Sequence, residues 1–370
     1  MGDESARPAD QPMRIDIIIN NYNYGRFLGD AIDSALAQTH PHVRVIVVDD
    51  GSTDDSSQVI ASYLDRVVPV LKSNGGQGSA FNAGFAAADG DIVMFLDSDD
   101  MLDPGIAARV ATAVATQPDA GKIQWRMELA DADGQPTGAV LPAAHVPLPE
   151  GDMRRAELTF PFDIAWTATS GIAFPMAVLR QIMPMPEADY RIGADSYLQH
   201  LTPLLGPVVS LDVIGANRRV HGDNAYEQLS TASLDLAHVH EAIREAAVTR
   251  VQLEQLATRL DLQRPSGAIL SVSDLAHRLI SLRFDRANHP MPGDDRARLA
   301  LAGARAALRR FDVDPAMRAA FCAWFLATAV APRPVALRLG RLFLFPEQRA
   351  GVNRLLRLLH RGHGDDEPLE

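Results

Sequence analysis

Residues 15–54 read IDIIINNYNYGRFLGDAIDSALAQTHPHVRVIVVDDGSTD, and this stretch decides the fold class. Residues 14–20 form an apolar, β-branched run that is typical of a buried strand. Apolar residues then recur at helical spacing from Phe27 to Leu36, and Pro41 ends the predicted helix. A second strand over 43–48 follows, so the order strand, helix, strand predicts a βαβ unit.

The same alternation continues beyond this unit. A third strand is predicted over 67–71, a fourth over 92–96, and a helix from 104 to 117. The pattern predicts an α/β domain with a mostly parallel central sheet. Ligands of such sheets bind beyond the carboxyl ends of the strands. Three polar clusters follow predicted strands, so they should converge on one site: residues 20–23, 49–50 and 97–100.

Composition excludes several classes of protein. The 370 residues carry a formal net charge of −12, which argues against a nucleic-acid binder, because such a protein needs a basic face. Cys322 is the only cysteine, so no intramolecular disulfide forms. The N-terminus lacks a signal-peptide pattern, and no run of eighteen apolar residues occurs. The expected location is therefore the cytoplasm.

The acidic cluster Asp97-Ser98-Asp99-Asp100 has two interpretations. Acidic residues at a strand end also solvate turns and cap helices. A calcium-binding EF-hand loop is excluded, because Leu102 and Ala108 stand where it needs glycine and glutamate. Two carboxylates separated by one residue can instead bind one Mg²⁺ or Mn²⁺ that also holds a diphosphate. The acidic pair at 49–50, at the end of another strand, favours this metal site.

The glycine-rich segment 74–78 (NGGQG) is less specific. It lacks the GK[ST] of a P-loop, and Phe81 stands where a dinucleotide-binding fingerprint has glycine. A tight turn and a backbone contact to a ligand both fit the segment, and Gly76 is the candidate for such a contact.

The chain resembles the donor half of family 2 glycosyltransferases, which have the GT-A fold. The resemblance runs from IDIIINN (15–21) through VVDDGSTDDS (47–56) and NGGQGSAFNAGF (74–85) to FLDSDD (95–100). It continues more weakly through TSGIAF (169–174), RIGADSYL (191–198), PLLGP (203–207) and RRVHGDN (218–224). It covers residues 14–224 and implies that they form a catalytic GT-A domain. A disordered N-terminal tail is expected over 1–13. A helical region over 225–362 and an acidic tail over 363–370 are expected to follow.

The resemblance implies roles for the donor-side residues. Asn20, Tyr22 and Asp50 should hold a uracil-type base, with the ring of Tyr22 stacked on it. Asp97 should meet the ribose, and Gly76 and Ser98 are expected to complete the donor site.

It also implies a metal site and a general base. Asp99 should bind Mn²⁺ or Mg²⁺ together with His221, which otherwise reads as a surface-loop histidine. Asp195 should be the base that deprotonates the acceptor. The family often has glutamate before this aspartate, whereas this chain has Ala194. Without the resemblance, Asp195 reads as a helix-terminal charge that the helix dipole favours. The expected acceptor-binding residues are Trp166, Thr169, Ser170 and Arg191.

The implied activity is inverting transfer of a sugar from a nucleotide diphosphate, with UDP as the expected nucleotide, to a hydroxyl of a glycan or lipid-linked acceptor. Assembly of a bacterial polysaccharide or cell-surface glycan is the expected setting. A sugar nucleotidyltransferase is the nearest alternative, but it would have a basic loop after its first strand, and here only Arg26 is basic. A non-catalytic nucleotide-sugar-binding module is the second alternative.

The C-terminal region differs in charge from the rest. Residues 316–363 contain eight arginines and one acid, Glu347, beside short apolar runs. Two interpretations stay open for residues 317–361. They could bind an anionic membrane surface at the inner face of the membrane, or they could form a helical bundle packed on the catalytic domain. Apolar residues at heptad spacing from Val239 to Leu260 also permit a homodimer.

Overall fold

The computed structural model describes residues 12–222, 235–263, 269 and 271–345. The tail expected over 1–13 lies almost entirely outside these residues, and the acidic tail over 363–370 does so completely. The elements are β1 (Ile15–Asn21), α1 (Gly25–Leu36), β2 (Val43–Asp49), α2 (Ser56–Ala61), β3 (Val68–Leu71), α3 (Gln77–Ala87), β4 (Ile92–Asp97), β5 (Met101–Leu102), α4 (Ile106–Thr116), β6 (Lys122–Ala130), β7 (Pro136–Leu141), α5 (Arg154–Glu157), β8 (Ile172–Pro175), α6 (Met176–Leu179), α7 (Ala194–Leu205), β9 (Val208–Arg219), α8 (Leu236–Arg259), α9 (Val272–Phe284), α10 (Arg296–Arg309), α11 (Pro315–Val330) and α12 (Arg333–Leu344).

The chain divides into two compact units. The first comprises residues 1–224 and 247–267, and the second comprises 225–246 and 268–370. The region that we expected to be a separate helical part, 225–362, is thus shared between the units, because the C-terminal part of α8 belongs to the first.

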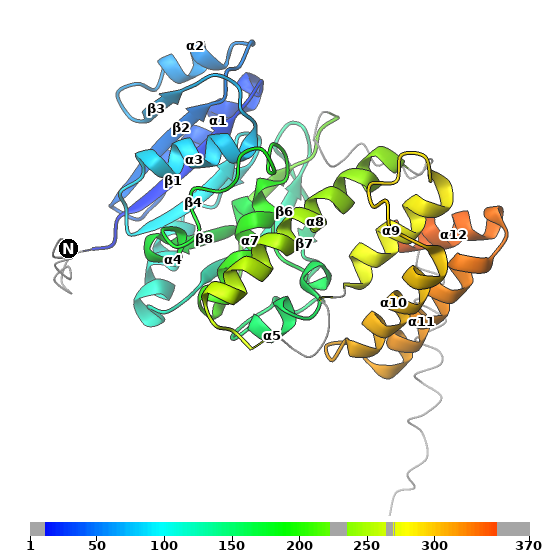
Figure 1. Ribbon diagram of the computed structural model, residues 1–370. Helices are drawn as coiled ribbons and strands as arrows, with labels where there is room; N and C mark the ends of the chain where they lie inside the picture. The colour runs from blue at the N-terminus through cyan, green and yellow to red at the C-terminus, as the bar shows by residue number, and fades with distance from the viewer. Residues whose placement is uncertain (1–11, 223–234, 264–268, 270, 346–370) are drawn as a thin grey trace, which may run out of the picture. The chain divides into compact units, whose positions relative to one another are not determined.

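Within the described residues, the first unit contains one nine-stranded sheet with the order β3-β2-β1-β4-β8-β6-β9-β5, and β7 pairs with β6 (Figure 1). The predicted α/β fold class is confirmed. Strands β3, β2, β1 and β4 are parallel, as the strand–helix alternation predicted. Beyond β4 the sheet is mixed, because β8 runs antiparallel to both β4 and β6.

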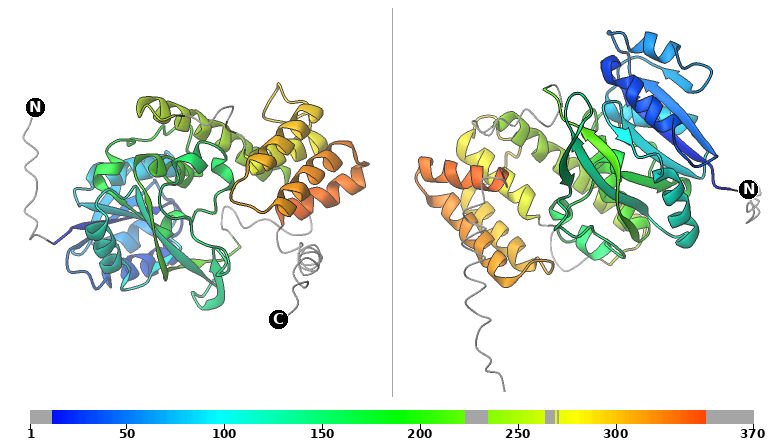
Figure 2. Two further views of the ribbon diagram at one scale, coloured as in Figure 1. Left: turned by 90° about the horizontal axis from the view of Figure 1, so that it is seen from below. Right: turned by 180° about the vertical axis from the view of Figure 1, so that it is seen from behind.

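Helices cover both faces of the parallel half of the sheet (Figures 1 and 2). Because side chains alternate along a strand, Ile17 and Ile19 of β1 pack with α1 and α4, whereas Ile18 packs with α3 and α7. Leu253 and Leu256 of α8 join the second of these cores. The two cores therefore pack on opposite faces of the sheet and support the edge at which β1, β2 and β4 end.

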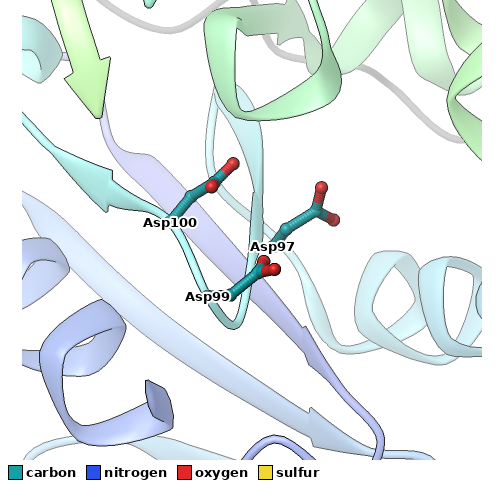
Figure 3. A group of neighbouring side chains, drawn as sticks. All are labelled: Asp97, Asp99 and Asp100. Atoms are coloured by element: carbon teal, nitrogen blue, oxygen red, sulfur yellow. The ribbon is translucent and has the colours of Figure 1, made fainter. Parts of the chain in front are cut away.

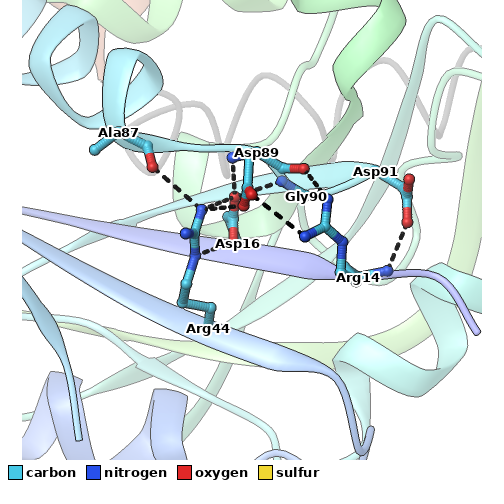
Figure 4. Close-up of polar contacts among 7 residues, drawn as sticks. All are labelled: Arg14, Asp16, Arg44, Ala87, Asp89, Gly90 and Asp91. Atoms are coloured by element: carbon cyan, nitrogen blue, oxygen red, sulfur yellow. Dashed lines mark hydrogen bonds and ion pairs between the residues drawn. The ribbon is translucent and has the colours of Figure 1, made fainter. Parts of the chain in front are cut away.

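A polar network closes the opposite edge of the sheet (Figure 4). The carboxylate of Asp16, 1% exposed, accepts two hydrogen bonds of 2.8 Å from Arg44 and two of 2.7 Å from the amides of Asp89 and Gly90. Every oxygen of this buried carboxylate therefore has a partner, so Asp16 holds the turn between α3 and β4 in place.

The described part of the second unit is helical. Helices α10 and α11 approach closely at Gly303, where a side chain would collide with the ring of Phe325. A polar clamp joins Ser281 Oγ to His289 Nδ1 at 2.8 Å and His289 Nε2 to Asp294 at 3.0 Å. Ser281 is completely buried, so this serine–histidine–aspartate arrangement is structural. None of the described helices has the length and apolar character needed to cross a bilayer.

The heptad-spaced residues of α8 are buried against other residues of this chain. Val239, Ala246 and Leu253 are at most 7% exposed. Their spacing therefore reflects packing within the chain and gives no support to the homodimer that the heptad spacing permits.

Candidate active site

Three carboxylates project from one turn after β4 (Figure 3). Asp97 ends the strand, and Asp99 and Asp100 follow it in the turn that leads to β5. Each offers one carboxylate oxygen, and these oxygens lie within 4.8 Å of one another. The turn thus places three hard oxygen donors at the carboxyl edge of the sheet, as the sequence predicted.

The carboxylates of Asp97, Asp99 and Asp100 repel one another. Burial and the charge of Asp99 raise the pKa of Asp97 to about 7, although Asn20 donates a hydrogen bond to it. Burial, Asp99 and Asp97 also raise the pKa of Asp100 well above its usual value. A divalent cation would offset this repulsion. The residues present therefore fit Mg²⁺ or Mn²⁺, which prefer carboxylate oxygen.

His221 lies beside this turn. Its Nε2 is 3.1 Å from Asp99 Oδ2, and its ring packs on Phe27 at a centroid distance of 4.5 Å. The antiparallel pairing of β5 with β9 brings these segments together. Arg219 secures the pairing, because its amide donates to Asp100 at 3.1 Å and its Nε donates to the backbone oxygen of Asp99 at 3.2 Å. His221 is thus a buried neighbour of the acidic turn.

The end of β1 supplies the neighbouring polar groups. Asn20 Nδ2 donates to Asp97 at 3.1 Å, while Asn20 Oδ1 is buried without a hydrogen-bond partner among the described residues. A buried unpaired acceptor is costly, so it marks a place where a ligand donor would be favourable. Tyr22, two residues further on, is 46% exposed and leaves an aromatic ring available at this edge.

Asp50 organises the glycine-rich segment. Its buried carboxylate accepts hydrogen bonds from Lys72 Nζ at 2.6 Å, from the Gly75 amide at 2.9 Å and from the Gly76 amide at 2.7 Å. Gly76 has φ +91°, and a side chain there would collide with Arg191. The exposed Arg191 also donates to Asn74. Arg191, expected to bind the acceptor, therefore lies on the glycine-rich segment.

Asp195 lies in the first turn of α7 and is partly buried. Its carboxylate accepts from the Ser196 amide at 3.1 Å and from Gln199 Nε2 at 3.2 Å. Its negative charge contributes to the raised pKa of Asp97, so the two carboxylates share one site. Burial raises the pKa of Asp195 and outweighs the lowering by backbone hydrogen bonds, chiefly from the Ser196 amide, and by nearby positive charge.

Most of the remaining residues predicted to bind the acceptor are buried near the carboxyl edge of the sheet. Thr169 and Ser170 are 1% exposed, and Ser170 Oγ accepts a hydrogen bond from the Asp97 amide at 3.2 Å. Ser98 is also buried. Trp166 is partly exposed and donates from Nε1 to the buried Glu157 at 2.7 Å. Contacts of these residues with donor or acceptor stay predictions.

Sequence reasoning missed two basic residues, one beside Trp166 and one that acts on Asp97 and Asp195. Lys122 is completely buried, donates to the backbone oxygen of Gln199 at 3.0 Å and lies over the Trp166 ring at 3.3 Å. Burial lowers the pKa of Lys122 well below its usual value. Arg218 is partly exposed, acts electrostatically on Asp97 and Asp195, and has no hydrogen-bond partner among the described residues. Its place in RRVHGDN was the one signal for it.

Comparison with known sequences identifies relatives. The model of glycosyl transferase family 2 matches residues 16–157. An uncharacterized glycosyltransferase of Nostoc sp. is 36% identical over 227 residues, which cover 60% of this chain and 69% of that protein. An uncharacterized glycosyltransferase of Rickettsia prowazekii is 42% identical over 90 residues, but the match covers 24% of this chain and only 28% of that protein.

Comparison with solved structures identifies the fold. The crystal structure of residues 1–349 of S. aureus TarS in complex with UDP-GlcNAc is similar, with a TM-score of 0.50 over 86% of this chain and 90% of that chain. The sequences are 17% identical, so this likeness concerns the fold alone. It confirms that the first unit has the GT-A fold expected from the sequence.

Proposed function

Because the chain belongs to glycosyl transferase family 2, we propose that it transfers a sugar from a nucleoside diphosphate to a hydroxyl of a glycan or lipid-linked acceptor, with inversion. One observation carries this proposal. The acidic turn 97–100, the unpaired oxygen of Asn20 and the carboxylate of Asp195 meet at one edge of the sheet. Donor, metal and base can therefore act on a single sugar.

The acidic turn would hold the cation. We assign Asp99 and His221 as its ligands, with Asp97 beside them, and Mn²⁺ or Mg²⁺ as the ion. When bound, the ion would act as a Lewis acid that neutralises charge on the leaving diphosphate. Arg218 lies near Asp97 and Asp195, so we assign its guanidinium to the same developing charge.

The end of β1 would hold the donor nucleotide. Tyr22 offers an exposed ring for stacking, and the Asn20 oxygen needs a donor. Asp50, predicted to contact the base, also fixes Gly75 and Gly76 by accepting hydrogen bonds from their amides. TarS is a structural relative solved with UDP-GlcNAc, which makes UDP the first nucleotide to test.

Asp195 would deprotonate the acceptor hydroxyl. A base works best when its pKa lies near the operating pH, and burial moves the pKa of Asp195 upward from the ordinary value for aspartate. Gln199 fixes the carboxylate from one side, because its amide also donates to the Thr167 backbone oxygen at 2.9 Å. The orientation of Asp195 and the upward direction of its pKa shift both support this role.

A donor screen tests the proposal. Thermal denaturation of the full chain with Mn²⁺ and UDP-, GDP- or dTDP-sugars should show one donor that raises the midpoint, because ligand bound to the folded state stabilises it. That donor should then release its nucleotide diphosphate when turnover is measured. Stabilisation without turnover would favour a binding module, whereas turnover of a nucleoside triphosphate with a sugar phosphate would favour a nucleotidyltransferase.

Replacing Tyr22 by alanine should weaken UDP binding by about 1–3 kcal/mol, the usual contribution of a base stacked on an aromatic ring. Titration calorimetry in the presence of Mn²⁺ measures the change. Phe311→Ala is the matched control, because Phe311 is 47% exposed against 46% for Tyr22 and lies in the second unit. Equal UDP affinity for Tyr22→Ala and the wild type would remove Tyr22 from the donor site.

A further inference from the structure

Large apolar side chains of α10, α11 and α12 are exposed. They are Leu301 (56% exposed), Leu308 (64%), Leu326 (48%), Val330 (83%) and Val335 (47%). Helices α10 and α11 lie side by side in both views (Figures 1 and 2). We call the exposed residues of these three helices the basic apolar face. Leu301 and Leu308 recur at helical spacing on α10, as Leu326 and Val330 do on α11. Exposed apolar residues that repeat along one side of a helix favour a contact with something other than water.

Helix α11 shows the apolar character most clearly. From Ala319 to Val330 it contains no charged residue. Its exposed positions in this stretch are Ala319, Ala323, Leu326, Ala327 and Val330, which recur at helical spacing. A helix on the surface of a soluble domain normally presents charged or polar residues to water. The outer side of α11 therefore lacks the polar stripe that exposure to water favours.

The same helices carry a large positive charge. Residues 296–345 contain nine arginines and no lysine, and their only acids are Asp312 and Asp314, although the whole chain has a net charge of −12. Arg305 of α10 and Arg338 of α12 are exposed. Arg310 is not available, because it is buried and pairs with Asp312. By spacing, Arg305 lies on the same side of α10 as Leu301 and Leu308, and Arg338 lies on the same side of α12 as Val335. Exposed arginine and exposed apolar side chains are therefore neighbours on these helices.

We propose that the basic apolar face binds the surface of an anionic lipid membrane. Arginine side chains would contact the lipid headgroups, and the leucine and valine side chains would enter the boundary with the acyl chains. A second copy of this chain is a poorer partner, because a symmetric contact would bring two strongly positive faces together. The proposal includes α10, which the sequence did not single out, and does not use residues 346–361, which lie outside the described part of the chain. It does not depend on the activity of the first unit.

Flotation of the full-length protein with vesicles tests the proposal. The protein should float with vesicles of phosphatidylglycerol and phosphatidylcholine at low salt, stay unbound with pure phosphatidylcholine, and dissociate as salt rises. The double variant Arg305→Glu, Arg338→Glu should bind roughly 10-fold more weakly or worse, because each basic residue near the surface contributes. The double variant Leu326→Ser, Val330→Ser should also lose binding.

The control variant is Arg66→Glu, Arg109→Glu, which makes the same change of charge at exposed positions of the first unit. It should bind as the wild type does, and all variants should retain the circular dichroism and the thermal midpoint of the wild type. The proposal is overturned if the wild type fails to float with anionic vesicles, or if the control loses binding as strongly as the Arg305 and Arg338 variant. Light scattering that shows a dimer, dissociated by Leu326→Ser and Val330→Ser, would assign the face to a second copy instead.

Discussion

Replacing Asp99 by asparagine should lower donor turnover by roughly 10²-fold or more, because the variant loses a charged oxygen ligand of the metal. Asp99 lies between Asp97, whose pKa it raises, and His221 Nε2 at 3.1 Å. Asparagine keeps the size of the side chain but removes its negative charge. The fold should persist, since one carboxylate fewer reduces the repulsion within the acidic turn.

Manganese titration of nucleotide release measures this change. The variant should need far more Mn²⁺ for half-maximal turnover, and its thermal midpoint without metal should equal or exceed that of the wild type. Asp65→Asn is the control, because the side chain of Asp65 is 83% exposed and lies away from the acidic turn. Wild-type turnover by Asp99→Asn at limiting Mn²⁺ would show that Asp99 does not bind the metal.

Replacing Asp195 by asparagine should lower sugar transfer by roughly 10²-fold or more while leaving donor affinity unchanged. Proton abstraction from the acceptor matters in the transition state, so its loss lowers turnover more than ground-state binding. Asparagine can still accept from the Ser196 amide, which donates to Asp195 at 3.1 Å, so α7 should remain in place.

Steady-state kinetics with a competent acceptor, together with UDP calorimetry, separate the two effects. UDP affinity and the Mn²⁺ requirement should match those of the wild type. Asp189→Asn serves as control, because Asp189 is an exposed carboxylate in the loop before α7. If Asp195→Asn keeps near-normal turnover and Asp189→Asn does not, the base is Asp189 and Asp195 is only a helix-terminal charge.

Local pattern was sufficient for the parallel half of the fold. The apolar runs over 14–20, 43–48 and 92–96 became β1, β2 and β4, and the polar residues after them met at one edge. This works because buried parallel strands are continuous apolar runs, and because crossover helices force their carboxyl ends to one side. The position of the acidic turn in the fold therefore follows from the amino-acid sequence.

The half of the sheet beyond β4, which has mixed strand directions, could not be predicted from local pattern. Antiparallel pairing of β8 with β4 and of β5 with β9 joins segments about 80 to 115 residues apart, and local periodicity carries no information on such partners. The contact of His221 with Asp99 follows from that pairing, and only the family resemblance pointed to it. Which of Arg218 and Arg219 is buried also depends on strand register. Arg219 pairs with Asp30 at 2.6 Å, whereas Arg218 is partly exposed.

The central claim is that the acidic turn supports metal-dependent use of a nucleotide sugar. The most direct measurement is release of nucleotide diphosphate from a UDP-sugar by the full-length protein, first with Mn²⁺, then with excess EDTA, and then with Mn²⁺ restored. The predicted result is turnover that EDTA abolishes and Mn²⁺ restores. Full turnover in excess EDTA would contradict the metal site, and no turnover with any UDP-, GDP- or dTDP-sugar and acceptor would contradict the proposed enzyme.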